Sequence, residues 1–368
     1  MKRRTVMTSL ISLALTAGIS PAHATQTKEG TWAKLRTYGT PPSARSVPST
    51  AAVGRHVYVF GGVHDSFSSG ENTFLNDVHR LDTTTGRWTA IQPQGVQPPP
   101  RAWADSAPYG HSFLIFGGSR YNPAGTELEV FNDLWSFDTV YRRWREIRPA
   151  NAGPSGRSGA TVWVGGGRLY VFGGVDATFT ALNDLWAYDF GRNSWALLST
   201  NSAAGAPPPR HIASSGTKPV NGKLVIYGGE GVSGGSFSML ADTWEFDLLR
   251  KTWKEITPAT GNLEPPHNYT ASGVIGNRFY LHGGDIPGGQ AGCGAPFDQN
   301  PTDDIWSFDL NAHTWRRHQP QAQPARLKRH SGTVVSGRMY INSGWDFQCA
   351  DGVGPGQVWN LDTYVFTP

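Results

Sequence analysis

The chain has 368 residues, of which 45 are Gly, 26 are Pro and 14 are Trp, while only 16% are charged. It carries 32 Lys and Arg against 28 Asp and Glu, and three of the basic residues fall within the first 24 positions. The remainder is therefore close to neutral, and no basic run marks a nucleic-acid-binding face and no basic amphipathic helix marks a membrane surface. Abundant glycine, proline and aromatic residues predict an all-β protein with many short strands joined by turns.

Residues 1–24, MKRRTVMTSLISLALTAGISPAHA, predict a secretory signal peptide. A basic head precedes an apolar stretch, and Ala22-His23-Ala24 forms a small-x-small cleavage site. Arg3-Arg4 also resembles a twin-arginine signal, so the sequence leaves both export routes open. No other stretch is long and apolar enough to span a membrane. We expect residues 25–368 to form one exported domain, periplasmic or secreted, and monomeric.

One phrase recurs along the mature chain at intervals of 55 to 60 residues. It consists of an aromatic apolar run that ends in Gly-Gly, then a variable loop, and then a run such as Asp184-Leu185-Trp186-Ala187-Tyr188-Asp189. The pairs lie at Gly61-Gly62, Gly117-Gly118, Gly173-Gly174, Gly228-Gly229 and Gly283-Gly284, with Ser343-Gly344 as a degraded sixth. A tryptophan follows six residues after each closing Asp, at Trp88, Trp144, Trp195, Trp253 and Trp315.

Each repeat predicts four strands, and repeats of this length built from four strands are typical of propeller blades. The last repeat ends before its tryptophan, with 358–362 matched to the third strand. Residues 31–36, TWAKLR, resemble the missing fourth strand and match the start of Trp144-Arg145-Glu146-Ile147-Arg148. The sequence therefore predicts a six-bladed β-propeller of four-stranded antiparallel sheets whose last blade is closed by the N-terminal strand.

The apolar run, the Gly-Gly pair, Asp-x-Trp-x-Phe/Tyr-Asp and the spaced tryptophan resemble kelch repeats over residues 31–366. The resemblance implies a kelch-type propeller, a family that includes galactose oxidase-like enzymes as well as binding modules. For function it leaves the two classes open, because one fold hosts many activities.

A basic residue ends the loop that enters the first strand of each repeat. The candidate ligand-binding residues are Arg45, Arg101, Arg157, Arg210, His267 and Arg329. If these residues ring the mouth of the central channel, their guanidinium groups could bind a carboxylate, sulfate or phosphate. Alternatively each arginine holds its own or the next blade together through backbone carbonyls. Related kelch proteins use arginines at matching positions for acidic peptides or sulfated substrates, which supports the first interpretation.

His267 breaks the arginine pattern and could titrate near neutrality, which makes it the candidate catalytic residue. The loops after Gly-Gly lie on the same face and open with polar or aromatic residues that differ between repeats. These are His64 and Asp65, Arg120 and Tyr121, Asp176, Glu230, Asp285, and Trp345 with Asp346. The sequence leaves open whether their carboxylates form ion pairs or line a pocket.

The two cysteines, Cys293 and Cys349, fall in corresponding loops of adjacent repeats and predict a disulfide in an exported protein. We expect no metal and no cofactor. The Cys, Tyr and His set of a galactose oxidase copper site cannot be placed on one face, and the iron-binding arrangement of nitrile-specifier proteins is absent. Asn268-Tyr269-Thr270 fits a glycosylation sequon.

Together these observations predict a binding module whose Arg-rich mouth engages an acidic protein segment or an anionic small molecule. The alternative is an enzyme that acts on an acidic sugar, similar to a mutarotase or sialic-acid epimerase, with His267 and a loop carboxylate exchanging protons. A third possibility is a structural protein without a pocket.

Overall fold

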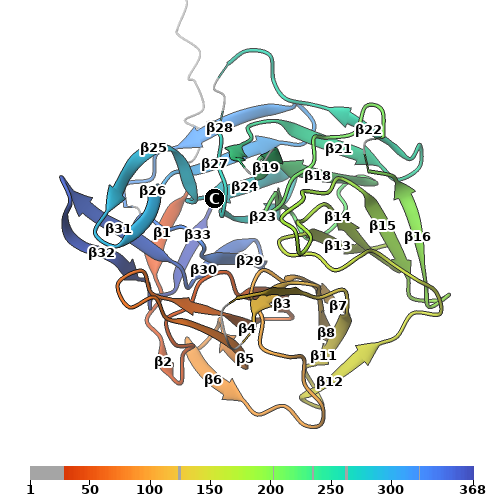
Figure 1. Ribbon diagram of the computed structural model, residues 1–368, viewed down its shortest axis with the longest axis horizontal. Coiled ribbons are helices and arrows are strands. Elements are labelled where there is room, and N and C mark those ends of the chain that lie inside the picture. Colours follow the sequence, from red (N-terminus) through yellow and green to blue (C-terminus); the bar gives the residue numbers. More distant parts are fainter. Residues whose placement is uncertain (1–28, 123–125, 202, 234–235, 262–263, 323) are drawn as a thin grey trace, which may run out of the picture.

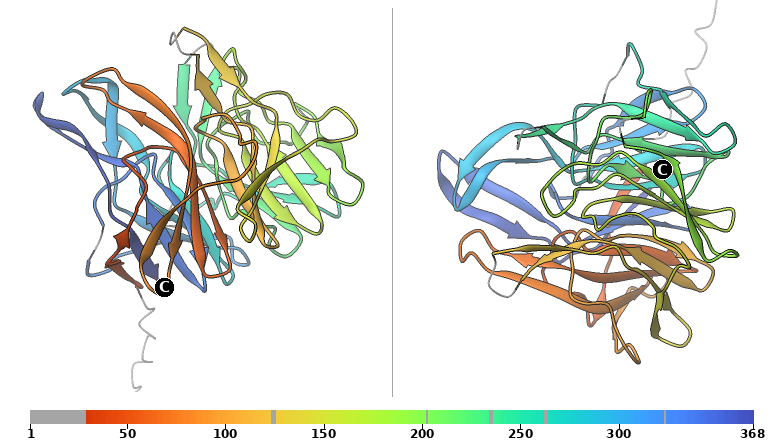
Figure 2. Two further views of the ribbon diagram at one scale, coloured as in Figure 1. Left: turned by 90° about the horizontal axis from the view of Figure 1, so that it is seen from below. Right: turned by 45° about the vertical axis from the view of Figure 1, so that its right-hand side comes forward.

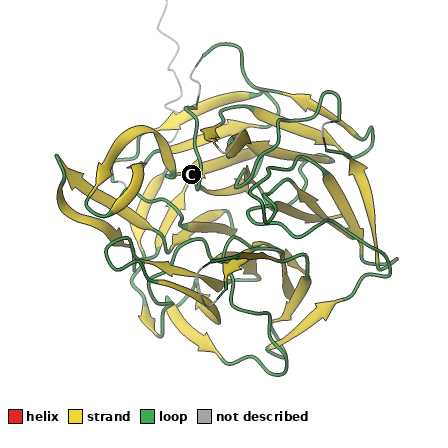
Figure 3. Ribbon diagram, viewed as in Figure 1, coloured by secondary structure: helices red, strands yellow, loops and turns green. Residues whose placement is uncertain are grey.

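The computed structural model describes residues 29–122, 126–201, 203–233, 236–261, 264–322 and 324–368, so the expected signal peptide at 1–24 lies outside the described residues. The described chain contains strands and no helix (Figure 3). Six sheets form a ring and make up the blades of a propeller (Figure 1). Neighbouring first strands contact one another all the way round, which places them at the central axis.

The first three blades follow the predicted up-and-down order. Blade 1 contains β3 (Ser49–Val53), β4 (His56–Asp65), β5 (Asn72–Asp82) and β6 (Arg87–Ile91), with β2 (Tyr38–Gly39) parallel to β6. Blade 2 contains β7 (Asp105–Tyr109), β8 (Ser112–Phe116), β11 (Leu134–Asp138) and β12 (Arg143–Ile147). Blade 3 contains β13 (Thr161–Gly165), β14 (Arg168–Phe172), β15 (Leu185–Asp189) and β16 (Ser194–Ser199).

Blades 4 to 6 repeat this order. Blade 4 contains β17 (Ser214–Ser215), β18 (Lys223–Tyr227), β21 (Thr243–Asp247) and β22 (Thr252–Glu255). Blade 5 contains β23 (Ala271–Ile275), β24 (Arg278–His282), β27 (Ile305–Asp309) and β28 (Thr314–His318). Blade 6 contains β29 (Ser331–Val335), β30 (Arg338–Asn342), β33 (Tyr364–Thr367) and β1 (Thr31–Lys34).

The N-terminal strand completes blade 6, as the sequence predicts. Strand β1 pairs antiparallel with β33, and Trp32 lies opposite Phe366 as Trp315 lies opposite Phe308 in blade 5. The predicted position of the third strand is wrong, because residues 358–359 belong to the preceding hairpin and the strand itself is Tyr364–Thr367. The inserted hairpin lengthens this repeat, so the sequence match falls on the end of the hairpin, a few residues before the true third strand.

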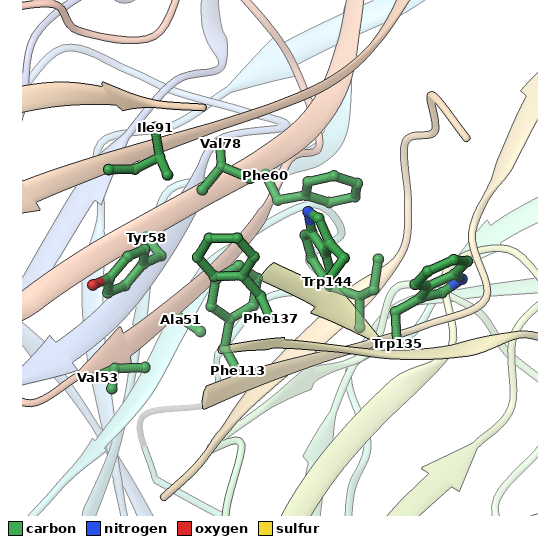
Figure 4. Packing of buried hydrophobic residues seen from close by; sticks show 11 residues of the cluster. Ala51, Val53, Tyr58, Phe60, Val78, Ile91, Phe113, Trp135, Phe137 and Trp144 are labelled. Atoms are coloured by element: carbon green, nitrogen blue, oxygen red, sulfur yellow. The ribbon is translucent and has the colours of Figure 1, made fainter. Parts of the chain in front are cut away.

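The repeated tryptophans pack between blades, which a single blade could not achieve alone. Trp144 of blade 2 contacts Phe60 of blade 1 with ring centroids 4.8 Å apart, and it also contacts Phe113 and Phe137 of its own sheet (Figure 4). The same contact recurs as Phe116–Trp195, Phe172–Trp253 and Tyr227–Trp315. Burial of large aromatic rings at each interface is the main stabilising contribution that the repeat motif encodes.

The backbone N–H of the second glycine in each pair donates a hydrogen bond to a backbone carbonyl in the loop that enters the next blade. Gly61 and Gly62 adopt φ values of 61° and 95°, and a Cβ at Gly61 would lie 2.7 Å from the Arg101 carbonyl oxygen. Glycine therefore allows the backbones to approach, and the Gly62 N–H donates to that same carbonyl at 2.9 Å. Equivalent bonds run from Gly118, Gly174, Gly229, Gly284 and Gly344 to Arg157, Arg210, His267, Leu327 and Arg45. These six bonds close the ring.

Four two-stranded hairpins join second and third strands. They are β9 (Ser119–Tyr121) with β10 (Leu128–Val130), β19 (Glu230–Ser233) with β20 (Ser236–Met239), β25 (Asp285–Gly292) with β26 (Ala295–Pro301), and β31 (Trp345–Ala350) with β32 (Val353–Trp359). Figure 2 shows the hairpins of blades 5 and 6 extending from one face of the ring. This face, which also carries the loops entering the first strands, holds the candidate site.

Candidate functional site

Four of the predicted ligand-binding arginines lie inside their own blades. Arg45, Arg101, Arg157 and Arg210 have 0% exposed side chains. Each guanidinium pairs with the aspartate that begins the third-strand motif and donates to the carbonyl of the first glycine of the Gly-Gly pair. The bonds to aspartate join Arg45 to Asp77, Arg101 to Asp133, Arg157 to Asp184 and Arg210 to Asp242. We call each pair a blade clamp.

The blade clamps favour the structural interpretation of these arginines. Arg157 Nη1 donates to Asp184 Oδ1 at 2.6 Å and to the Gly173 carbonyl at 2.9 Å, so the fork is already engaged. Burial alone would raise the pKa of Asp77, but hydrogen bonds from Arg45 and His79 hold it well below its ordinary value. These guanidinium groups are engaged by protein acceptors and reach into the blade, as in the structural alternative that the sequence left open.

Arg329, the predicted basic residue of the sixth blade, is out of register with the other five positions. The inter-blade bonds show that Leu327 occupies the clamp position of blade 6, two residues before Arg329. Arg329 instead belongs to the residues that enter the first strands with φ between 45° and 64°. These residues are Val47, Trp103, Gly159, Ile212, Tyr269 and Arg329. Of the six predicted ligand-binding residues, Arg329 is therefore the one that lines the cavity described below.

His267 occupies the clamp position of blade 5 and is 1% exposed. Burial lowers the pKa of His267 to about 4, although the Asp304 carboxylate opposes the shift. Its Nδ1 lies 3.3 Å from Glu264 Oε1, and burial raises the pKa of Glu264 well above its ordinary value. A buried histidine that does not line the pocket described below leaves the mutarotase interpretation without its candidate proton-transfer residue.

A cavity of about 800 Å³ opens on the hairpin face at the channel mouth. One aromatic residue from each of blades 1 to 5 lines it, and each comes from the segment between second and third strands. They are Phe67, Tyr121, Phe179, Phe237 and Phe297. We call this set the aromatic collar. Four of its members are substantially exposed, up to 55% for Phe237. The presence of this cavity argues against a purely structural role.

The cavity floor carries three ion pairs. Arg329 Nη1 donates to Asp65 Oδ2 at 2.6 Å, and Lys328 Nζ donates to Asp285. His211 Nε2 lies 3.0 Å from Glu230 Oε2. Burial alone would raise the pKa of Glu230, but the hydrogen bond and charge of His211, with a smaller effect of Asn268, hold it below its ordinary value.

Each oxygen of the Asp65 and Asp285 carboxylates accepts a hydrogen bond from a protein donor, whereas part of the Arg329 guanidinium has no partner. One oxygen of Asp65 accepts from the Ser46 hydroxyl and the other from Arg329. The two oxygens of Asp285 accept from the Asn300 N–H and from Lys328 Nζ. Arg329 Nε has no hydrogen-bond partner among the described residues. Arg329 also lies over the ring of Tyr269 at 4.9 Å and near those of Trp103 and Trp345. The floor therefore offers donors on a guanidinium held among aromatic rings.

The kelch model for the KLHDC2/KLHL20/DRC7 kelch-repeats domain matches residues 18–174 and 106–284. The chain belongs to the kelch-repeat family. Kelch domain-containing protein 3 of Bos taurus is 31% identical over 225 residues, which cover 59% of this chain and 55% of that protein. Kelch domain-containing protein 10 of Homo sapiens is 28% identical over 264 residues, covering 70% and 56%. Acyl-CoA-binding domain-containing protein 4 of Arabidopsis thaliana is 31% identical over 254 residues, covering 66% and 35%.

The chain spans about half the length of the kelch domain-containing relatives it matches. Kelch propellers are commonly protein-interaction modules. Within the described residues, no helix is long and apolar enough to cross a membrane. In the same residues, no group of three or more His, Cys, Asp or Glu side chains is placed to hold a metal ion.

Sequence reasoning found part of this kelch site. It named Asp65, Tyr121, Glu230 and Asp285, which all line the cavity, and it paired Cys293 with Cys349, which form a disulfide. It missed Lys328, His211 and most of the aromatic collar. The signal was present, because each interstrand loop of blades 1 to 5 carries an aromatic residue, 3 to 13 positions after the second glycine. Asn268 of the sequon is 2% exposed and bonded to Glu230, so the folded protein does not present it for glycosylation.

Proposed function

We propose that this kelch propeller is a binding module that takes up a segment of a partner protein in the cavity at the channel mouth. The observation that carries the proposal is the aromatic collar above a floor with unused guanidinium donors. Exposed aromatic residues gathered around a cavity mark an interaction site, because a monomer gains nothing from leaving them in water. Apolar side chains of the segment would contact the collar.

The charged residues at the cavity floor determine which polar group of the segment can bind there. The Arg329 guanidinium lines the cavity and not all of its donors have a protein partner, so a ligand acceptor fits beside it. A carboxylate of an acidic side chain supplies such an acceptor and could bind the guanidinium through two parallel hydrogen bonds. The acidic segment expected from the sequence is thus retained, with Arg329 as its anchor in place of a ring of six basic residues.

A peptide selection tests this function. Random 12-residue peptides displayed on phage are selected on the immobilised protein, and enriched peptides are measured by fluorescence anisotropy. We expect enriched peptides to combine Asp or Glu with aromatic or aliphatic residues. Arg329→Met should weaken their binding about tenfold or more, since a charge-assisted hydrogen bond contributes about 1.5–3 kcal/mol.

The collar and a distant surface supply the matched variants. Phe237→Ala with Phe297→Ala should also weaken binding, whereas Leu249→Ala should not. Leu249 is 89% exposed in the turn between β21 and β22, on the opposite face of the ring. If no peptide were enriched, or if the Arg329→Met variant bound the enriched peptides as tightly as the wild type, the cavity would not bind acidic segments.

We further propose that the protein works outside the cytoplasm. The basic head, apolar stretch and cleavage site of residues 1–24 support export, as does the Cys293–Cys349 disulfide. Residues 1–24 fused to bacterial alkaline phosphatase, which is active only after export, should give active enzyme. Replacing Arg3-Arg4 by Lys-Lys distinguishes the routes, because only twin-arginine export should be abolished. Activity absent from both fusions would contradict export.

A further inference from the structure

The Cys293–Cys349 disulfide joins the hairpins of blades 5 and 6, which also pack against each other beside it. Cys293 lies in the turn between β25 and β26 of blade 5, and Cys349 lies in β31 of blade 6, with Cα atoms 6.0 Å apart. Figure 1 shows the two hairpins side by side at the edge of the ring. Among the described residues, no backbone ladder links one hairpin to the other. The disulfide is thus their covalent tie, and both cysteines are partly exposed to solvent.

The hairpin of blade 5 is weakly held by its own backbone. Strands β25 and β26 pair in register at only three positions, with shifts between them. Gly292, Cys293 and Gly294 all have positive φ, and Cys293 at 45° adopts a conformation that is unfavourable for a non-glycine residue. A sparse ladder and an unfavourable turn conformation indicate that the disulfide contributes much of the order in this hairpin.

The blade 5 hairpin forms one wall of the cavity, and the blade 6 hairpin contacts the cavity-lining residue Phe67. Strand β26 carries Phe297 of the aromatic collar and Gln299, whose Oε1 accepts a hydrogen bond from Lys328 Nζ at 2.6 Å. On the blade 6 side, Gln357 Oε1 accepts a hydrogen bond from the Phe67 N–H at 3.3 Å. The Phe67 ring also meets Trp345 edge-on at 5.3 Å. Movement of the disulfide-linked hairpins would therefore displace collar residues of blades 1 and 5.

Blades 5 and 6 are also the two blades without a blade clamp. His267 and Leu327 stand where the other four blades have arginine, so the first and third strands of these blades lack the buried Arg–Asp bonds. The aspartate at the third strand of blade 5, Asp304, bonds Arg317 on the exposed side instead. The cavity wall thus rests on the least rigidly held part of the ring.

We infer that the Cys293–Cys349 disulfide is a redox-exchange site that controls the order of this cavity wall. A dithiol reductant attacks the disulfide, two electrons and two protons pass to the protein to give two cysteine thiols, and the reductant leaves as its cyclic disulfide. Reduction loosens the two hairpins and leaves the clamped blades 1 to 4 intact. The resulting loss of ligand affinity rests on the proposed function, whereas the loosening itself does not.

Hydrogen exchange measured by mass spectrometry tests the inference on the whole protein. The wild type, folded first, is compared with and without dithiothreitol, whose only target is this bond because the chain has two cysteines. We expect amide exchange at least tenfold faster in peptides covering residues 285–301 and 345–359, and unchanged exchange in β13 to β16. Unchanged exchange in the hairpins, or faster exchange throughout the ring, would overturn the inference.

A variant and a binding measurement complete the test. Cys293→Ser with Cys349→Ser should exchange fast in the same hairpins and should not respond to dithiothreitol. The acidic peptide enriched by selection should bind the reduced wild type at least tenfold more weakly than the oxidised protein. If the reduced and oxidised proteins bound the peptide equally although the hairpins had loosened, the claim that the disulfide controls the cavity would be overturned, and the claim that it orders the hairpins would stand. Enrichment of no peptide would refute the proposed function and leave the exchange result to decide the redox inference.

Discussion

Replacing Arg157 by Leu is expected to lower the free energy of unfolding by about 3–5 kcal/mol. The substitution removes the partner of a buried carboxylate. Asp184 is 10% exposed in its side chain and receives both Arg157 nitrogens, at 2.6 Å and 3.0 Å. Without the guanidinium, Asp184 keeps only the Trp186 indole among its side-chain donors, and the Gly173 carbonyl loses its bond to Nη1. Urea unfolding followed by tryptophan fluorescence measures the change.

The same blade supplies the matched control. Arg192 pairs with Asp189 at 2.9 Å but is 75% exposed in its side chain, so Arg192→Leu should cost less than about 1 kcal/mol. The double change Arg157→Leu with Asp184→Leu should recover part of the loss, because it removes the unpaired charge as well. A cost below 1 kcal/mol for Arg157→Leu, together with weakened ligand binding, would instead support the ligand-binding interpretation of this arginine.

The repeat made the ring predictable. Spacing of Gly-Gly, the Asp-x-Trp motif and the later tryptophan determines strand order, because each residue has a steric or packing role that recurs in every blade. The closure of blade 6 could also be predicted, since Trp32 and Leu35 repeat the spacing of Trp144 and Ile147. The third strand of blade 6 was misplaced because Val358-Trp359 imitates the motif inside an inserted hairpin.

The candidate site was less predictable, for a geometric reason. A basic residue in every entry loop looks the same in sequence whether it enters the blade or faces the channel. Two positions along the chain separate the clamp residue Leu327 from Arg329, and the positive φ at Arg329 marks the residue that lines the cavity. The aromatic collar was missed because its members come from loops of unequal length, so their distance from Gly-Gly is not constant along the chain. Such a site exists only once the ring has closed.

Blades 5 and 6 replace apolar repeat positions by histidine. His282 stands where blades 1 to 3 have Phe60, Phe116 and Phe172, and His330 stands where blade 2 has Ala104. The two rings share a hydrogen bond of 3.0 Å between His282 Nδ1 and His330 Nε2. Burial lowers the pKa of His330 to about 3 and the pKa of His282 well below its ordinary value, with a smaller contribution from neighbouring histidines to the latter. Both rings are therefore neutral in the folded protein at neutral pH, and His330 remains neutral in mild acid.

This arrangement predicts destabilisation at acid pH. An unfolded histidine binds its proton near pH 6.5, so below that pH the unfolded chain holds more protons and the free energy of unfolding falls as pH falls. His267 and His318 act in the same direction, because burial lowers the pKa of each to about 4. Two carboxyl groups act in the opposite direction: burial raises the pKa of Asp105 to about 6 and that of Glu264 well above its ordinary value.

His282→Phe with His330→Ala restores the residues of the other blades and isolates the pair. Each removed histidine takes away about 1.4 kcal/mol of acid destabilisation per pH unit. From pH 6.5 to 4.5 the variant should therefore lose at least about 2 kcal/mol less than the wild type, which is the contribution of His330 alone, as measured by urea unfolding at each pH. His111→Gln, at an exposed turn, serves as the control. If the variant lost stability in parallel with the wild type, the two histidines would have to gain protons without unfolding. The contact between blades 5 and 6 would then accommodate charged His282 and His330 side chains, although burial of an unpaired charge is unfavourable.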